Sequence, residues 1–267
     1  MPQIAVERRG AVAICTITNP PMGYMDSQTV PELDAVTRQL EADETVRAVV
    51  ITGGVPGVFV RHYSVHELEE LSLGLRAQGL RVDTNARVPE RGLDHVFRRI
   101  ETIPKPVVAA INGMAMGGGF ELALACDFRV AEAGPYWLGL PEINVGILPG
   151  AGGTQKLARL IGTARTLEMT LRGRTVSPEE ALHLGIVHEL TPAGQALDRS
   201  IALASEIASK PATAVAHIKR LVRAAIETPI DDGLALERTL FLDLLVSDDA
   251  LRLMHRMNEG NNDIRSP

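Results

Sequence analysis

Two glutamates in the middle of the chain, Glu121 and Glu142, have the residue type and surroundings that suit acid–base chemistry. Each stands alone among apolar neighbours, and Glu121 follows the triple glycine at residues 117–119, which in turn follows the apolar run 107–111. A glycine turn between a buried strand and a helix leaves backbone N–H groups free at the positive end of the helix dipole, where an anion or a developing oxyanion is stabilised. Two carboxyls beside such N–H groups can move protons next to a carbonyl.

The glycine-rich segments fit no nucleotide-binding motif. The spacing G-x-G-x-x-G is missing after the run 107–111, and no Gly-Lys-Ser/Thr follows residues 146–153. A triple glycine can also serve only to let a strand and a helix pack closely. The coincidence of two glycine segments with two isolated glutamates favours the chemical interpretation.

Metal and nucleophile chemistry are weaker hypotheses. His62 and His66 stand four positions apart and could share a helix face, but no glutamate lies between them and no third ligand is evident. Ser64 lacks the G-x-S-x-G turn of a serine nucleophile. Cys15 and Cys126 each lie in an apolar run, which is typical of reduced core thiols. We therefore predict no metal site, a reducing compartment and a cytoplasmic location.

Composition places the chain among soluble globular proteins. Of its 267 residues, 45% are hydrophobic and 22% charged, which suits one large domain or a core with an appendage. The formal net charge of −6 argues against nucleic acid or an anionic membrane surface as the main partner, because both require a basic surface. The sequence also has no uncharged run long enough to cross a membrane.

Hydrophobic periodicity predicts alternating strands and helices, beginning with a strand pair, a helix and a further strand that look like the start of a repeated ββα unit. The predicted strands are residues 3–7, 12–18, 46–52, 107–111, 128–131, 136–138 and 186–190. The predicted helices are residues 27–40, a helix from 65, and 93–100, 121–126, 153–161, 166–171 and 178–184. Residues 74–91 have no clean period and contain Gly74, Gly79 and Pro89; we expect them to form a mobile surface segment that could act as a lid.

After residue 192 the sequence shows helical periodicity only. Three or four helices are expected, broken at Pro211, at Pro229 and near Ser247. Such a tail is too small to fold on its own core and must pack on the body or on another subunit. We therefore divide the chain into a core, residues 1–192, and a C-terminal helical region for packing and oligomerisation, residues 193–267.

Residues 111–127 and 140–155 resemble the enoyl-CoA hydratase/isomerase (crotonase) family. The similarity is strong over residues 104–185 and continuous, though weaker, from about residue 3 to 250. It is carried by Asn112-Gly113, by Gly117-Gly118-Gly119-x-Glu121-Leu122-Ala123, by Pro141-Glu142 and by Pro149-Gly150-Ala151-Gly152-Gly153-Thr154. The resemblance implies an α/β fold, a crotonase-like spiral of ββα units with a C-terminal helical trimerisation region, assembled as a homotrimer or homohexamer.

The resemblance also implies an acyl-CoA thioester as ligand and no separate cofactor, because coenzyme A is part of the substrate. The thioester oxygen would lie between the backbone N–H groups of Tyr63 and Gly118, each worth ~3–4 kcal/mol of transition-state stabilisation. Glu121 and Glu142 match the two acids with which hydratases hold and deprotonate a water for attack at Cβ and deliver a proton to Cα. Further contacts with the substrate are expected from Arg61, His62, Gly117 and Gly150.

The function expected from this resemblance is that of an enoyl-CoA hydratase, a hydro-lyase that converts a 2-enoyl-CoA to a 3-hydroxyacyl-CoA. Two alternatives stay open: another acyl-CoA reaction of the same fold, such as double-bond isomerisation or C–C bond hydrolysis, and a non-catalytic member that only binds CoA esters. The sequence departs from the family at Arg61-His62-Tyr63-Ser64, where Ala-Gly-Ala-Asp is usual. Tyr63 is bulky and is expected to narrow or reshape the acyl pocket.

Overall fold

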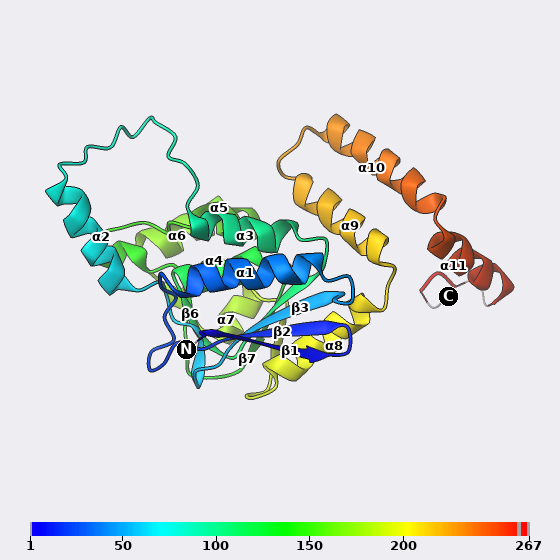
Figure 1. Cartoon of the computed structure of the whole chain (residues 1–267), viewed down its shortest axis with the longest axis horizontal. Helices are drawn as coiled ribbons and strands as arrows, with labels where there is room; N and C mark the ends of the chain where they lie inside the picture. Colours follow the sequence, from blue (N-terminus) through cyan, green and yellow to red (C-terminus); the bar gives the residue numbers. More distant parts are fainter. Residues whose placement is uncertain (1, 261–262, 266–267) are drawn as a thin grey trace.

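The strands of the computed structural model, which describes residues 2–260 and 263–265, form two sheets (Figure 1). The six-stranded sheet has the order β1 (Ile4–Arg9), β2 (Val12–Ile17), β3 (Ala48–Gly53), β5 (Val107–Ile111), β7 (Phe128–Glu132) and β10 (Glu189–Thr191). The four-stranded sheet has the order β4 (Gly57–Val60), β6 (Gly113–Met116), β8 (Leu138–Gly139) and β9 (Thr175–Val176). The pairs β1–β2 and β8–β9 are antiparallel, and the other strand pairs are parallel.

The chain runs as a spiral in which each turn contributes one strand to each sheet. Strand β3 is followed by β4, β5 by β6, and β7 by β8, and helices follow each pair. The helices between these turns and β10 are α2 (Val65–Ala77), α3 (Gly92–Thr102), α4 (Gly118–Ala125), the short η1 (Glu142–Val145), α5 (Gly153–Ile161), α6 (Thr163–Leu171) and α7 (Pro178–His183). The repeated ββα unit predicted from the sequence is therefore confirmed.

The six-stranded sheet is covered on both faces. Every residue of β3 and β5 is buried, as expected for parallel strands rich in β-branched and small residues. Figure 1 shows α1 (Thr29–Ala42) and α3 above these strands and α8 (Ala196–Ala208) below them. Helix α8 approaches the sheet through its buried Ser200 and Ala204. This helix belongs to the predicted C-terminal region, and it packs on the body rather than away from it.

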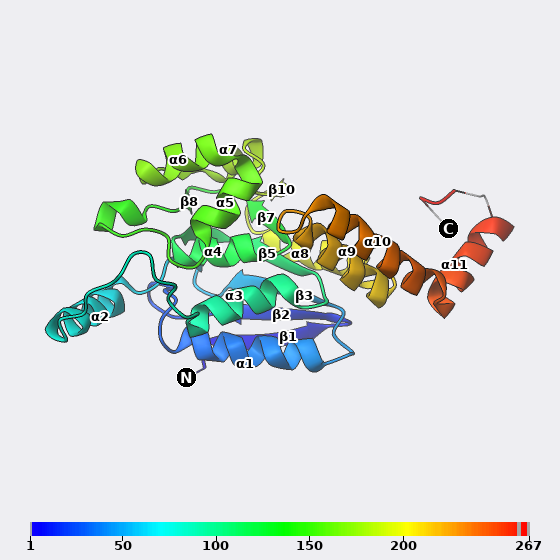
Figure 2. The same cartoon turned by 90° about the horizontal axis from the view of Figure 1, so that it is seen from above.

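Helix α9 (Ala212–Ala224) is bound to the body through Lys219 and Arg223, whereas α10 (Ile230–Leu245) and α11 (Asp248–Glu259) extend away from it (Figures 1 and 2). Together with α8 they are the helices that the sequence predicted in this region. These helices and the segments that join them carry exposed large hydrophobic side chains, among them Ile218, Val222, Ile226, Ile230, Phe241, Leu242, Val246 and Leu251. Residues 1, 261, 262, 266 and 267, which fall within the two predicted regions, lie outside the described residues.

Three predictions of local structure need correction. Helix α2 continues to Ala77, so the irregular segment begins at residue 78 rather than 74; Gly74 lies on the surface of the helix, where a glycine costs only ~1 kcal/mol. The predicted strand 186–190 is wrong in its first half, because Ile186 and Val187 are buried core residues outside the sheet and the pairing begins at Glu189. Strand β6 was missed, since its four residues include no β-branched one and lead directly into the triple glycine.

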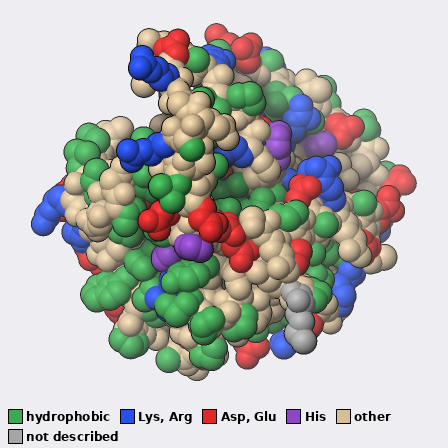
Figure 3. All heavy atoms as spheres, turned by 60° about the vertical axis from the view of Figure 1, so that its left-hand side comes forward, with side chains coloured by type: hydrophobic (Ala, Val, Ile, Leu, Met, Phe, Trp, Pro, Cys, Tyr) green, Lys and Arg blue, Asp and Glu red, His purple; other side chains and the backbone are tan. Residues whose placement is uncertain are grey.

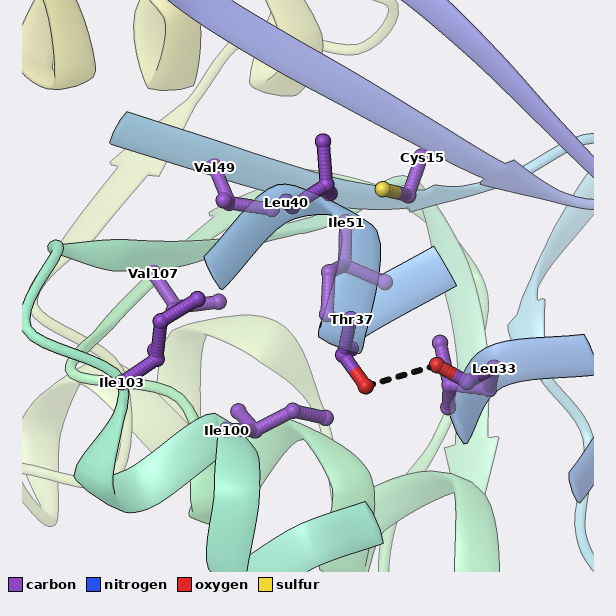
Figure 4. A pocket seen from close by; sticks show the side chains of 9 residues that line it. All are labelled: Cys15, Leu33, Thr37, Leu40, Val49, Ile51, Ile100, Ile103 and Val107. Carbon is purple, nitrogen blue, oxygen red and sulfur yellow. Dashed lines mark hydrogen bonds between the residues drawn. The ribbon is translucent and has the colours of Figure 1, made fainter. Parts of the chain in front are cut away.

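A small apolar cavity lies between α1, α3 and the six-stranded sheet (Figure 4). Its volume is about 10 Å³, and it is lined by Cys15, Leu33, Thr37, Leu40, Val49, Ile51, Ile100, Ile103 and Val107. The Thr37 hydroxyl donates a hydrogen bond to the Leu33 carbonyl at 2.8 Å, so its proton is used within α1. A space of this size holds no substrate, since ligand pockets measure roughly 300–1,000 Å³. The cavity is a packing feature of the core.

Candidate active site

The triple glycine lets α4 begin directly against the end of β4. Gly117 has φ +49° and ψ −127°, a conformation that residues with a side chain rarely adopt. A Cβ added to Gly119 would lie 1.9 Å from the carbonyl oxygen of Val60, so only glycine permits this approach. Helix α4 is thereby held within the core, and Glu121 in its first turn is only 3% exposed.

The carboxylate of Glu121 is held by the second glycine segment. Its Oε1 accepts the N–H groups of Ala151 and Gly153, each at 2.8 Å, where α5 begins. Burial raises the pKa of Glu121 above its ordinary value, and these two N–H groups and the positive charges of Lys156 and Arg91 offset that rise in part. Amides at the start of α5 therefore bind a carboxylate of the protein itself, whereas the amides that the sequence suggested as an anion site lie at the start of α4.

Glu142 lies beside Glu121 in a different environment. A Cβ added to Gly117 would lie 3.1 Å from Glu142 Oε1, which places this carboxyl against the turn before α4. Its Oε2 is buried and accepts no hydrogen bond from any residue that the structure describes. Burial, with a smaller contribution from the charge of Glu121, raises the pKa of Glu142 from its ordinary 4.5 to about 7. The structure thus brings the two predicted glutamates together and leaves one of them with an unused acceptor.

The backbones of Tyr63 and Gly118 lie side by side at the start of α4. A Cβ added to Gly118 would be 3.4 Å from the Tyr63 backbone nitrogen. Tyr63 forms an isolated β-bridge with Met25, but the residues on either side of Tyr63 make its hydrogen bonds. Met25 N–H donates to the His62 carbonyl at 2.9 Å, and Ser64 N–H donates to the Met25 carbonyl at 2.7 Å. Among the described residues, neither the Tyr63 nor the Gly118 N–H donates to an acceptor.

The phenol of Tyr63 is held by α2. Its hydroxyl donates to Glu67 Oε2 at 3.0 Å, and Ser64 caps the same helix by accepting the Glu67 N–H. Burial and the neighbouring Glu67 raise the pKa of Tyr63 to about 12, so this side chain stays a neutral donor. The bulky residue that departs from the family pattern is thus fixed by its own hydrogen bond.

The four residues predicted to contact substrate lie at different places. Gly117 and His62 lie next to Glu142, since a Cβ on Gly117 would be 3.5 Å from the His62 Cβ. Gly150 belongs to the loop that holds Glu121. Arg61 donates to the Met22 carbonyl at 2.8 Å and is thereby directed to the segment before α1. Their contacts with a substrate stay predictions.

The histidines have local partners. The His62 Nδ1 lies 2.7 Å from the Tyr63 carbonyl oxygen, and its ring centroid is 4.7 Å from that of Tyr24. His66 lies in α2 and pairs with Glu70 at 3.4 Å. In the described ranges, no group of three or more histidine, cysteine or acidic side chains could hold a metal ion.

Two cations near Glu121 were not predicted. Arg91 donates to the Gly150 carbonyl, and Lys156 Nζ donates to the Ala151 carbonyl at 3.1 Å. Lys156 lies in the first turn of α5, so its position beside the glycine segment could have been inferred from the sequence. Arg91 ends a segment without periodicity, and no pattern marks it. Figure 3 shows the face from which α2 projects, where hydrophobic, acidic, histidine and basic side chains lie around a hollow.

The spiral of ββα turns, with Glu121 at the start of the central helix α4 and Glu142 beside it at the start of η1, is that of a crotonase-fold protein. The model of the enoyl-CoA hydratase/isomerase family matches residues 7–261. The chain therefore belongs to the enoyl-CoA hydratase/isomerase family, as the sequence motifs predicted.

Individual relatives agree with this assignment. The short-chain-enoyl-CoA hydratase of Clostridium acetobutylicum is 32% identical over 247 residues, which cover 92% of this chain and 90% of the relative. A probable enoyl-CoA hydratase of Bacillus subtilis is 36% identical over 240 residues, or 90% and 89% of the two chains. The crystal structure of an enoyl-CoA hydratase from Bacillus anthracis matches with a TM-score of 0.85 at 29% identity and covers 96% of each chain.

Proposed function

We propose that this protein hydrates a 2-enoyl-CoA to a 3-hydroxyacyl-CoA by reversible syn addition of water. The observation that carries the proposal is the adjacent pair of glutamates in unequal environments, Glu121 buried and Glu142 half-buried. Glu121 accepts two amide N–H groups, which favour its ionised form, whereas Glu142 has an unused buried oxygen and a pKa raised to about 7. Two neighbouring carboxyls whose environments differ in this way are suited to act as base and acid at neutral pH.

In the proposed reaction the ionised Glu121 takes a proton from a water molecule as its oxygen bonds to Cβ of the substrate. The electron pair of the double bond moves toward the thioester and forms an enolate. The protonated Glu142 then donates its proton to Cα. Glu121 ends with the proton taken from water and Glu142 ends ionised, so the total charge of the pair is unchanged. Proton exchange with solvent then restores the starting protonation of each carboxyl.

We further propose that the N–H groups of Tyr63 and Gly118 bind the thioester oxygen. Their backbones are adjacent, both donors are unused by the described residues, and Gly118 lies at the positive end of the α4 dipole. Each donor of this kind is worth ~3–4 kcal/mol of transition-state stabilisation. The phenol of Tyr63 is bound to Glu67 in α2, which leaves the backbone donor to the substrate.

We also propose that the protein is a homotrimer or homohexamer without a separate cofactor. The exposed hydrophobic side chains on α9, α10 and α11 support self-association, because such surfaces are rarely left in water. Light scattering after size-exclusion chromatography tests the assembly, and a monomeric mass would contradict it. Both cysteines are buried and free, which supports the proposed cytoplasmic location. Among the described residues, no helix combines the length and apolar character that a membrane crossing requires.

A panel of 2-enoyl-CoA esters tests the proposed reaction. Loss of the conjugated absorbance together with a product heavier by one water is the expected result. A product of unchanged mass would instead indicate double-bond isomerisation, and a shortened acyl chain would indicate C–C bond cleavage. Binding of the esters without any conversion would indicate a non-catalytic member of the family.

The raised pKa of Glu142 predicts a pH-dependent effect of the Glu142→Gln substitution on stability. Because the folded pKa lies above 4.5, the folded protein binds more protons than the unfolded chain between about pH 4.5 and 7. The stability associated with this proton is present at low pH and is lost as the pH rises through about 7. Thermal unfolding of Glu142→Gln and native protein is therefore expected to differ little at pH 5, with the variant more stable at pH 8. An equal difference at both pH values would contradict the burial argument.

Gly153→Ala is expected to lower kcat/KM for hydration by roughly 10- to 100-fold, the scale expected when a catalytic group is misplaced. The added Cβ would lie 2.9 Å from Glu121 Oε1 and 2.9 Å from Leu140 Cδ2, so the carboxylate must move. Steady-state kinetics on the best ester measures the effect. Gly74→Ala is the matched control, because a Cβ there meets no atom within 4 Å on the surface of α2. Full activity of Gly153→Ala would show that the carboxylate is not confined as described.

A further inference from the structure

Arg91 lies at the start of α3 with its guanidinium fixed between two partners. Its Nε and Nη2 donate to the two oxygens of Asp94 at 2.9 Å each, and its backbone N–H donates to Asp94 Oδ2 at 2.9 Å. The bond from the Arg91 N–H to Asp94 lies at the N-terminus of α3, and the two side-chain bonds fix the guanidinium there. The same Nη2 also donates to the carbonyl oxygen of Gly150, which lies 59 positions further along the chain. The guanidinium therefore connects the start of α3 to the loop before α5.

The carbonyl that Arg91 binds and the N–H that binds Glu121 belong to one peptide group. This group consists of the C=O of Gly150 and the N–H of Ala151, which point in opposite directions across a planar trans peptide. Ala151 N–H donates to Glu121 Oε1 at 2.8 Å in the buried site. A cation on the carbonyl oxygen restricts rotation of the peptide plane and polarises the N–H on its other side.

We propose that Arg91 is a positioning residue of this active site, which aims the Gly150–Ala151 peptide at Glu121 and stabilises the ionised carboxylate. The proposal rests on the proposed function, in which Glu121 is the base. In this proposal, the glycine loop before α5 is not sufficient by itself to orient the amide groups that donate to Glu121. A side chain from the segment before α3, outside the family motif, holds the peptide in place.

The other charged groups that face Glu121 act on it in known directions. Lys156 of α5 lowers its pKa as Arg91 does, while Glu142 of η1 is a like charge. The ammonium of Lys156 is shared with Glu101 Oε1 at 3.6 Å, and Glu101 also pairs with a cation of α9. Removal of Arg91 leaves these groups in place, so its effect on Glu121 can be measured separately.

Arg91→Met is expected to raise the pKa of Glu121 and so to move the acidic limb of the kcat/KM profile to higher pH. The loss of kcat/KM relative to native protein is therefore expected to be larger at pH 6 than at pH 8, on the order of 10-fold at pH 6. A purely structural role would lower activity by the same factor at every pH. Arg91→Lys keeps a positive charge and an N–H donor at this position. Its acidic limb in the kcat/KM profile is expected to lie between those of native protein and Arg91→Met. Arg91→Lys carries the test if Arg91→Met does not fold.

The matched control is Arg87→Met, which removes the same charge from the same exposed segment four positions earlier. It is expected to leave the profile unchanged. A second readout needs no turnover: pH-dependent infrared spectra follow the Glu121 carboxyl, assigned by its loss in Glu121→Gln. Suppose that native protein hydrates the esters, and that Arg91→Met and Arg91→Lys both keep the native acidic limb of kcat/KM and the native Glu121 titration. The inference about Arg91 is then overturned, and the proposed function stands. If native protein does not hydrate them, the proposed function fails, and the infrared titration alone decides the role of Arg91.

Discussion

Glu142→Gln and Glu121→Gln are each expected to lower kcat for hydration by at least ~10²-fold, the low end for a positioned general acid or base. Glutamine keeps the size of either side chain but cannot take up or release the proton. At position 121 its carbonyl oxygen can still accept the Ala151 and Gly153 N–H groups, so the loss reports the proton transfer rather than a collapse of the loop.

Steady-state kinetics with one enoyl-CoA ester measures both variants. The double variant is expected to be little worse than the slower single variant, because the two carboxyls act as a unit. Glu69→Gln is the control, since Glu69 is exposed on α2. Near-native turnover of either single variant would remove that glutamate from the mechanism.

Asp127→Asn is expected to lower the free energy of unfolding by ~3–5 kcal/mol, the range for removing one member of a buried ion pair. The Asp127 side chain is 13% exposed and pairs with Lys219 at 2.7 Å and Arg223 at 2.8 Å. Its Oδ2 also accepts the Val107 N–H at 2.8 Å. The substitution leaves the Lys219 ammonium, 9% exposed, without its counter-charge and weakens the attachment of α9 to the central strand.

Chemical denaturation at one fixed chain concentration measures this loss, and limited proteolysis shows whether α9 detaches first. Asp198→Asn serves as the comparison, because Asp198 is 81% exposed and pairs with Arg9 at 3.4 Å. Exposed ion pairs contribute ~0–1 kcal/mol. Equal effects of the two substitutions would show that the buried cluster does not anchor the helical tail.

The sequence predicted an element most accurately where its hydrophobic pattern was compatible with only one type of secondary structure. The run Val107–Ile111 is a strand at the predicted bounds, and α5 spans the predicted residues 153–161. The glutamate pair could be selected because both acids stand alone beside glycine segments. Strand β6 could not be predicted from the sequence. Its pairing with β4 depends on Gly113 packing against the Gly57 backbone, a contact between segments far apart in sequence.

The different environments of the two glutamates could not be predicted from the sequence. Nothing in the sequence distinguishes Glu121, held by two amides, from Glu142, whose Oε2 is buried without a partner among the described residues. The contact between Arg91 and Gly150 joins segments 59 positions apart and follows no periodicity. Local patterns predict which elements form, whereas the electrostatics of the site depends on which elements the spiral brings together.

Isotope incorporation tests the central claim most directly. Native protein is incubated with a 2-enoyl-CoA in ¹⁸O-labelled water and, separately, in D₂O, and the product is examined by mass spectrometry and NMR. Addition of water by the glutamate pair predicts one ¹⁸O at C3 and one deuterium at C2, both delivered to the same face of the double bond. A product without ¹⁸O, or one with deuterium at C4 and a shifted double bond, would contradict the account.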